Sequence, residues 1–283
     1  MTRTLNCARR PLDLQRPRVM GILNITPDSF SDGGRLYRQG VDLGRVTDVA
    51  CAMIEAGADL LDIGGESTRP GAEPVSYSEE CRRVMPVLER LVELDAIVSI
   101  DTRKPAVAKM AIQAGVHLVN DVTGMTNPDM IDTVADSDVA VCVMHMQGEP
   151  GTMQADPRYD DVICDIRGFL ARQMERCLKA GIGQDRLVLD PGFGFGKTID
   201  HNLALLRNLS EVKVHDLPLL VGLSRKRMIG TITGRGMQDR MVGSVAAALL
   251  AVQRGADILR VHDVGATVDA LKVLAAVDTP SLM

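Results

Sequence analysis

Aromatic residues are almost missing from this chain of 283 residues: there is no Trp, and Phe, Trp and Tyr together make up 2%. Proteins that hold single-stranded nucleic acid stack its bases on aromatic side chains, so this chain is poorly supplied for that role. The net charge of −5 also removes any bulk attraction to nucleic acid or to an acidic membrane surface. We therefore expect neither nucleic acid nor a membrane among its partners.

Long hydrophobic runs are missing too. No apolar stretch reaches the ~18 residues that a membrane-spanning helix needs. The basic first segment, MTRTLNCARR, lacks the apolar part of a secretory signal, so we expect a cytoplasmic protein. No two cysteines form a CxxC pair and most lie in apolar patterns, which predicts buried, reduced thiols. The cysteines are Cys7, Cys51, Cys81, Cys142, Cys164 and Cys177.

A nucleotide-binding phosphate loop is excluded at the one place where it could be suspected. Residues 190–198 read DPGFGFGKT, which ends like the ATP-binding loop GxxxxGK[ST]. In that loop the first glycine would stand where this chain has Pro191, which has no N–H to offer a phosphate. A GxSxG nucleophile turn and zinc-ligand spacings are absent as well. The run instead places Asp190 at the end of an apolar segment, before a glycine turn.

What the chain does have is a repeated phrase, in which a helix end, a glycine, a short apolar segment and a polar residue follow one another. It reads EAGADLLDIG at 55–64, QAGVHLVND at 113–121 and QRGADILRVHD at 253–263, with a looser copy at 179–192. The glycines suit the left-handed position that ends a helix. The segments are apolar throughout, as expected for strands that are buried on both faces.

The repeats fit eight strand-then-helix units, which predicts a single (β/α)8 TIM barrel of parallel strands with outer helices. An open, doubly wound sheet is the alternative, but no unit carries its GxGxxG turn. We expect one domain over 1–283 with its barrel core at about 18–277. The predicted strands are 18–24, 59–63, 97–101, 117–121, 139–144, 186–190, 218–223 and 257–262. The predicted helices are 41–56, 76–93, 105–114, 128–136, 160–180, 201–213, 239–254 and 265–277.

Almost every predicted strand ends in a residue that can do chemistry. Any one of these could simply cap the next helix, but capping explains the whole set poorly. In a TIM barrel these strand ends face the active site, so we expect a pocket that mixes acids and amides with cations. The residues are Asn24, Asp62, Asp101, Asn120, Asp121, His145, Asp190, Ser224, Lys226, Arg260 and His262.

Three loops after the strands support a ligand site. NITPDSFSDGG at 24–34 carries Phe30, and GGESTRPGAEP at 64–74 carries Arg69; both are predicted to close over a ligand. SRKRMIG at 224–230 places cations where a helix begins, which indicates a bound anion nearby. Acids and amides bind a polar heterocycle, cations hold a phosphate-type anion, and Asn24 offers a hard oxygen to Mg²⁺.

At this point the motifs resemble those of the dihydropteroate synthase family. GILNITPDSFSDGG, DIGGESTRPGA, SIDTRKP, VNDVTG, VMHMQGEPGTMQ, LDPGFGFGK, GLSRKRMIG and RVHDV occur in order between about 18 and 275. The resemblance implies a TIM barrel, usually a homodimer, that joins dihydropterin pyrophosphate to p-aminobenzoate. The products are 7,8-dihydropteroate and pyrophosphate, a step of folate biosynthesis that sulfonamides inhibit by mimicking p-aminobenzoate.

The resemblance also implies roles for individual residues. The pterin ring would be bound by Asp101, Asn120, Asp190 and Lys226, of which Asp101, Asp190 and Lys226 would also be catalytic. Pyrophosphate would be held by Asn24, Thr68, Arg69, Arg260 and His262, with Mg²⁺ on Asn24. The p-aminobenzoate would be bound by Phe30, Pro70, Ser224 and the backbone N–H of Arg227, a position at which some relatives have Ser. His145 and Glu66 would have supporting roles at most.

Two other functions remain open from the sequence. A methyltransferase that acts on a methylated folate would use a similar barrel, but it would not need the anion set formed by Arg69, Arg260 and His262. A catalytically silent relative that binds pterin or serves as a dimer partner should have lost some site residues, whereas all of them are present here.

Overall fold

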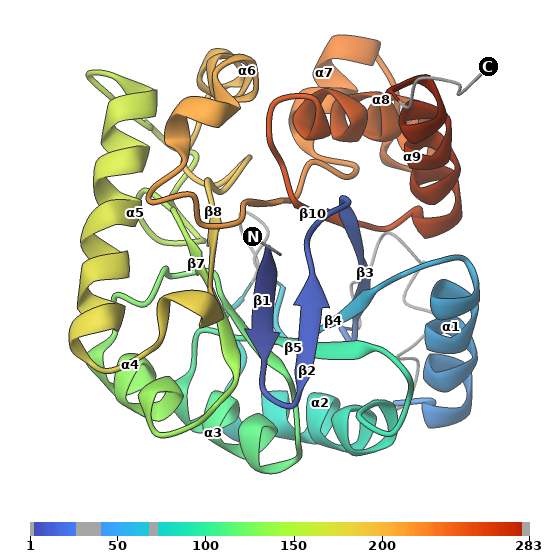
Figure 1. Cartoon of the computed structure of the whole chain (residues 1–283), viewed down its shortest axis with the longest axis vertical. Helices are drawn as coiled ribbons and strands as arrows, with labels where there is room; N and C mark the ends of the chain where they lie inside the picture. Colours follow the sequence, from blue (N-terminus) through green and yellow to red (C-terminus); the bar gives the residue numbers. More distant parts are fainter. Residues whose placement is uncertain (1–2, 27–40, 68–72, 279–283) are drawn as a thin grey trace.

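The computed structural model describes residues 3–26, 41–67 and 73–278 of the chain. Eight parallel strands form one sheet in the order β8-β7-β6-β5-β4-β3-β10-β9, and helices surround it (Figure 1). This confirms the predicted TIM barrel. The strands are β3 (Arg18–Asn24), β4 (Leu60–Gly64), β5 (Ile97–Asp101), β6 (Leu118–Asp121), β7 (Ala140–Met144), β8 (Leu187–Asp190), β9 (Leu220–Val221) and β10 (Ile258–Val261).

The ring closes between β8 and β9 through little pairing. Leu189 bridges Leu219 in parallel, and the Leu189 N–H donates to the Pro218 carbonyl at 2.9 Å. The sequence predicts a strand over 218–223, but β9 is only two residues long. It is short because Gly222 and the residues after it leave the sheet to form the rim of a cavity.

The outer helices follow the predicted stretches and pack apolar faces on the sheet. In α2, Val84, Leu88 and Leu91 recur at helical spacing and are fully buried, and Ser76 caps the first turn. The helices are α1 (Leu43–Glu55), α2 (Tyr77–Leu91), α3 (Pro105–Gln113), α4 (Pro128–Ala135), α5 (Val162–Lys179), α6 (Ile199–Arg207), α8 (Met241–Val252) and α9 (Val264–Asp278). The stretch predicted as one helix over 201–213 divides, because α6 ends at Arg207 and a separate 3₁₀ turn covers Leu209–Val212.

A short helix, α7 (Arg227–Thr233), lies between β9 and α8 and is additional to the eight predicted units. The expected cations do stand where this helix begins. The prediction for the cysteines is only partly right: all six are unpaired and Cys7, Cys142 and Cys177 are buried, but Cys164 is exposed near the start of α5. No helix among the described residues has the length and apolar character to cross a membrane.

An N-terminal hairpin, β1 (Thr4–Cys7) and β2 (Arg10–Asp13), covers one end of the barrel and was not predicted. Figure 1 looks onto this hairpin, which lies across the middle of the ring of strands. Its buried side chains join the residues that fill the amino-terminal part of the barrel interior. This cluster includes Leu5, Cys7, Leu12, Leu14, Met20, Leu60, Ile97, Leu118, Val188, Leu220 and Ile258.

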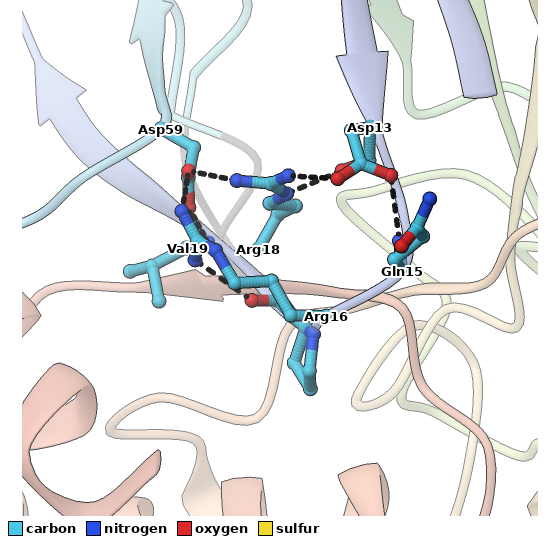
Figure 2. A network of polar contacts seen from close by, with 7 residues as sticks. Asp13, Gln15, Arg16, Arg18, Val19 and Asp59 are labelled. Carbon is cyan, nitrogen blue, oxygen red and sulfur yellow. Dashed lines mark hydrogen bonds and ion pairs between the residues drawn. The ribbon is translucent and has the colours of Figure 1, made fainter. Parts of the chain in front are cut away.

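Ion pairs fix the strand beginnings at the same end. Asp59, just before β4, accepts hydrogen bonds from Arg16 Nη2 at 2.7 Å, Arg18 Nη1 at 2.8 Å and the Val19 N–H at 3.0 Å (Figure 2). Asp257, just before β10, pairs with Arg3 and with Lys213. These contacts tie the hairpin and the first strand to the barrel and leave this end closed.

Candidate active site

A cavity of about 720 Å³ opens at the carboxyl ends of the strands, opposite the hairpin. Its volume suits a small-molecule ligand. Strand ends contribute Ile22, Asn24, Asp101, Arg260 and His262, and the loops after the strands contribute the rest of the wall. The barrel therefore brings residues that are far apart in sequence to one site.

Buried acids and an amide form the base of this site, which we call the pocket floor (Asp62, Asp101, Asn120 and Asp190). Arg260 Nε donates to Asp62 Oδ2 at 2.5 Å, and Arg260 Nη2 donates to Asp101 Oδ2 at 2.8 Å. The same Asp62 oxygen accepts from Asn120 Nδ2 at 3.0 Å. Asn120 and Asp190 are 3% and 5% exposed, so they lie beneath the cavity surface that Asp101 lines.

The two acids nearest the cavity hold their protons unusually tightly. Burial raises the pKa of Asp101 to about 7, and nearby Asp62 adds to this rise although Arg260 opposes it. Burial also raises the pKa of Asp190 to about 6, against the opposing effects of the Gly192 N–H and Lys226. Both carboxyls would therefore titrate near neutral pH, which is typical of functional acids.

The glycine run after β8 is pressed against the loop after β7. A Cβ at Gly192 would lie 1.9 Å from the His145 carbonyl oxygen, and one at Gly196 would lie 2.4 Å from the Gln147 carbonyl oxygen. Both glycines have positive φ, +69° and +60°. Only glycine permits such an approach, so the run serves backbone packing beside Asp190.

Lys197 ends this run and is 3% exposed. Its Nζ donates to the carbonyls of Gly192 at 2.9 Å and Phe195 at 3.0 Å, and lies 3.0 Å from His145 Nδ1. Burial lowers the pKa of Lys197 to about 7 and that of His145 to about 3, the latter with help from Lys197. Lys197 thus clamps the loop internally, which agrees with the exclusion of an ATP-binding loop.

Phe195 is a site residue that the sequence analysis missed. It lines the cavity, and Lys226 Nζ lies 4.1 Å from the centre of its ring, within cation–π range. The signal was a large apolar residue inside a run of glycines, LDPGFGFGK, where a core contact was not required. Phe195 holds the Lys226 ammonium over the side of the pocket.

The rim near α7 joins two predicted subsites. Ser224 Oγ lies 3.0 Å from His262 Nδ1 and accepts from the His262 N–H at 3.1 Å. The next residue, Arg225, pairs with Asp263 at 2.6 Å, which fixes the turn before α7. Movement at one of these two loops is therefore transmitted to the other.

A second polar network supports the loop after β4. Glu66 lines the cavity and pairs with Arg103 at 2.9 Å and with Lys104, whose Nζ also bonds to the fully buried Glu80 at 2.6 Å. Burial raises the pKa of Glu66, but the hydrogen bonds from Lys104 and Arg103 outweigh it, so the net shift is downward. Glu66 is thus held ionised at the pocket edge, in the supporting position that was expected.

The sequence matches the family described as "Pterin binding enzyme" over residues 20–262. The dihydropteroate synthase of Escherichia coli K12 is 47% identical over 266 residues, which cover 94% of this chain and 93% of that protein. The chain belongs to the pterin-binding enzyme family.

Solved structures of this family superpose closely on the chain. Yersinia pestis dihydropteroate synthase, determined as a sulfonamide drug complex, has a TM-score of 0.92 at 49% identity, covering 97% of this chain and 98% of that one. The Burkholderia cenocepacia enzyme, complexed with 7,8-dihydropteroate, has a TM-score of 0.88 at 48% identity, covering 98% and 96%. The barrel and its loops are thus those of dihydropteroate synthases of known structure.

The pterin-binding fold gathers most residues that the sequence predicted for the site. Asp101, Lys226, Arg260 and His262 line one cavity, and Asn120 and Asp190 lie directly below it. Asn24, Ser224 and Arg227 also line it. The predicted residues Phe30, Thr68, Arg69 and Pro70 lie outside the described residues. Their assigned contacts, like the ligand roles of the others, remain predictions.

Arg260 departs from its predicted role in one respect. It was expected to hold pyrophosphate, yet its guanidinium is paired with two acids of the pocket floor, Asp62 and Asp101. Asp62 was noted at a strand end but given no function, although its position two residues before the glycine of the GGES loop was a usable signal. The strand alternation places Asp62 inside the barrel, where it meets Arg260 from β10.

Asn24 was expected to hold Mg²⁺, and its surroundings fit that expectation. Its Oδ1 lies at the cavity edge near Gly64, with room beside it for a hydrated ion. The described residues contain no group of three His, Cys, Asp or Glu side chains arranged for a metal. One amide oxygen from the protein, with waters and phosphate oxygens completing the shell, is a common way to bind Mg²⁺.

Proposed function

We propose that this enzyme catalyses the dihydropteroate synthase reaction, in which dihydropterin pyrophosphate and p-aminobenzoate give 7,8-dihydropteroate and pyrophosphate. The observation that carries the proposal is the cavity itself, where a floor of buried acids and an amide meets a rim of cations in a chain of the pterin-binding family. The Burkholderia cenocepacia relative, solved with 7,8-dihydropteroate, supports the same product here.

The pterin ring fits the pocket floor by hydrogen-bond chemistry. Ionised Asp101 and Asp190 accept hydrogen bonds from ring N–H and amino groups, and Asn120 adds a further polar contact. Lys226 Nζ, held by Phe195, donates to the carbonyl oxygen or a ring nitrogen. Because these groups are buried, a ring that satisfies them binds far better than one that does not.

The pyrophosphate group fits the opposite side, where His262, Asn24 and the Arg260 guanidinium line the cavity and where Thr68 and Arg69 are predicted to reach. Positive charge at this side stabilises the negative charge that grows on the leaving group. A Mg²⁺ ion on Asn24 would supply the same stabilisation when bound.

The p-aminobenzoate carboxylate fits the rim near α7, where Ser224 and the backbone N–H of Arg227 are placed, with Phe195 beside it. Phe30 and Pro70 are predicted to complete this subsite. The Yersinia pestis relative was solved with a sulfonamide drug, and we expect sulfonamides to compete with p-aminobenzoate here as well.

The reaction needs no strong base in this site. The bond between the pterin methylene and the pyrophosphate oxygen breaks, and both electrons leave with pyrophosphate. The cationic methylene is stabilised by ionised Asp101 and Asp190 beneath the ring. The lone pair of the aniline nitrogen then forms the new carbon–nitrogen bond, and a proton passes from that nitrogen to solvent. An uncharged aniline is already a competent nucleophile at neutral pH.

The test is pyrophosphate release from dihydropterin pyrophosphate, measured with and without p-aminobenzoate and with and without Mg²⁺. We expect release that requires both substrates and Mg²⁺, that stops with Lys226→Ala, and that falls when excess sulfonamide is added. An enzyme that binds pterin but releases no pyrophosphate would instead be a silent relative. Transfer of a methyl group from a methylated folate would indicate the methyltransferase alternative.

A homodimer remains part of the proposal. Large apolar side chains are exposed on the neighbouring helices α8 and α9, in a region that a second copy of this chain would cover. They are Met241, Val242, Leu250, Val273 and Val277. Light scattering should give twice the chain mass, and Val242→Asp with Val277→Asp should give the monomer. A cytoplasmic location also remains proposed, because the charged pyrophosphate substrate does not cross membranes unaided.

A further inference from the structure

Asp62 lies at the centre of the pocket floor but has no assigned role in the reaction. It is fully buried, and its Oδ2 accepts from Arg260 Nε at 2.5 Å and from Asn120 Nδ2 at 3.0 Å. Asp62 and Asn120 stand on β4 and β6, on either side of β5. A single carboxylate oxygen thus connects the cation from β10 with the amide from β6.

The charge of Arg260 decides what Asp62 can offer. A guanidinium has donors only and stays charged in proteins, so the oxygen that faces Arg260 Nε must act as an acceptor. Asn120 can satisfy an acceptor only with its NH₂ group. The carboxamide is therefore turned so that Nδ2 faces Asp62 and Oδ1 faces away.

The outward oxygen of Asn120 carries the consequence. Within the described part of the chain, Asn120 Oδ1 is buried and has no hydrogen-bond partner. Asp101, the residue beside Asn120 in the sheet register, has an oxygen paired with Arg260. A buried acceptor without a donor is unfavourable, so this position favours a ligand that brings an N–H group.

We infer that Asp62 is a positioning residue that fixes the Asn120 carboxamide with its oxygen towards the ligand, so that the site selects a ring with an N–H donor at that edge. The 2-amino group of a pterin is such a donor. The inference rests on the proposed pterin-binding function and adds a selection rule to it. Because sites built around a ligand N–H reject analogues that lack it, the effect should be seen in selectivity.

The experiment compares two probes that differ in that group. 6-Hydroxymethylpterin carries a 2-amino donor, whereas 6-hydroxymethyllumazine has a carbonyl acceptor there, and calorimetry gives the Kd of each. In Asp62→Ala the Asn120 carboxamide is free to turn and offer Nδ2, so the preference for the pterin should fall about tenfold. Ser99→Ala, which removes a buried hydroxyl from the adjacent strand, is the matched control and should keep the preference.

Asp62→Asn separates orientation from charge. Arg260 Nε still requires an oxygen at this position, so the new side chain keeps an acceptor towards Asn120, and the preference should stay close to the wild-type value. Equal losses in Asp62→Ala and Asp62→Asn would show that Asp62 acts through its charge and would overturn the inference. An unchanged preference in Asp62→Ala would overturn it too. If the wild-type protein forms no product and binds no pterin, the proposed function fails instead.

A measurement on the wild-type protein covers the case in which Asp62→Ala does not fold. Side-chain NH₂ signals of ¹⁵N-labelled asparagine are recorded, and Asn120 is assigned by its loss in Asn120→Ser. We expect two separate Asn120 proton signals, one of which exchanges slowly with solvent, both without ligand and with 6-hydroxymethylpterin. Averaged, rapidly exchanging protons would mean a rotating carboxamide and would contradict the inference.

Discussion

The two ends of the barrel use polar residues in opposite ways. At the amino-terminal end, Asp59 and Asp257 are met by arginines, a lysine and backbone N–H groups, and the β1–β2 hairpin covers an apolar interior. At the carboxyl-terminal end, Asp101 and Asp190 have raised pKa values in an open cavity. Of the described buried side chains, the unpartnered polar atoms belong to Asp62, Ser99 and Asn120, all on the strands below that cavity.

This difference separates stability from function within one sheet. The closed end pairs its charges and buries leucines, which lowers the energy of the folded chain without a ligand. The open end keeps acids and an amide buried without enough partners, which costs stability until a ligand supplies donors and charge. Mutations at the two ends should therefore affect different measurements.

Asp190→Asn should give the largest effect and the clearest contrast between activity and stability. Loss of the carboxylate charge beneath the pterin is expected to lower kcat/KM by roughly 10²–10³-fold. The folded-state pKa of about 6 is above the ordinary value of 3.8, so this carboxyl contributes stability fully below pH 3.8 and loses it as pH rises through 6. At pH 8 the variant should therefore be more stable by on the order of 2–3 kcal/mol.

Chemical denaturation at pH 8 and pH 4, together with the pyrophosphate assay, checks this prediction. At pH 4 the stability difference should be small, because the wild-type carboxyl is then largely protonated. A variant that is less stable at pH 8 would show that Asp190 supports the fold.

Leu5→Ala tests the closed end. Leu5 is 1% exposed under the hairpin, and truncation in a packed interior costs about 2–5 kcal/mol. At temperatures where the variant is folded, kcat/KM should stay at the wild-type value because the hairpin is far from the cavity. Leu43→Ala, at a 40% exposed position on α1, is the control and should change stability by less than about 0.5 kcal/mol. A change in kcat/KM would show that the two ends are coupled.

Lys197→Met should weaken pterin binding about tenfold, since the carbonyls of Gly192 and Phe195 lose their donor and the loop that positions Phe195 loosens. Steady-state kinetics should show a higher KM for dihydropterin pyrophosphate and a smaller change in kcat. Lys179→Met, at an exposed position of α5, should leave both values unchanged. An unaltered KM in Lys197→Met would mean that the glycine turn is held by backbone packing alone.

Arg16→Ala should have the smallest effect. Its side chain is 60% exposed, and Asp59 keeps Arg18 and the Val19 N–H as partners (Figure 2). We expect a loss of less than about 1 kcal/mol in urea unfolding, smaller still in high salt, with activity unchanged. A larger loss would mean that the ion pairs at this end act as one network.

The sequence was most informative where the pattern is local. Eight apolar segments with a polar last residue predicted the barrel, and the strands and helices observed differ from the predicted ranges by a few residues in most cases. Lys226, Asp101 and Asp190 were also found this way, because strand ends in a parallel barrel meet at one face. The β1–β2 hairpin was missed, since two four-residue strands give too short a pattern to detect.

Contacts between distant residues could not be foreseen. Arg260 looked like a phosphate ligand because it is a cation on a strand, but its partners stand 198 and 159 residues away, at Asp62 and Asp101. Lys197 looked like part of a phosphate loop, yet it is buried among carbonyls of its own loop.

The sequence by itself determined the order of strands and helices and the residue types at the strand ends, because hydrophobic periodicity and glycine positions act over a few neighbouring residues. The tertiary structure decided which of those polar residues share charges and hydrogen bonds. Burial inside the closed ring removes water as a partner, so the protonation of Asp101 and the orientation of the Asn120 amide depend on side chains that only the folded barrel brings within reach.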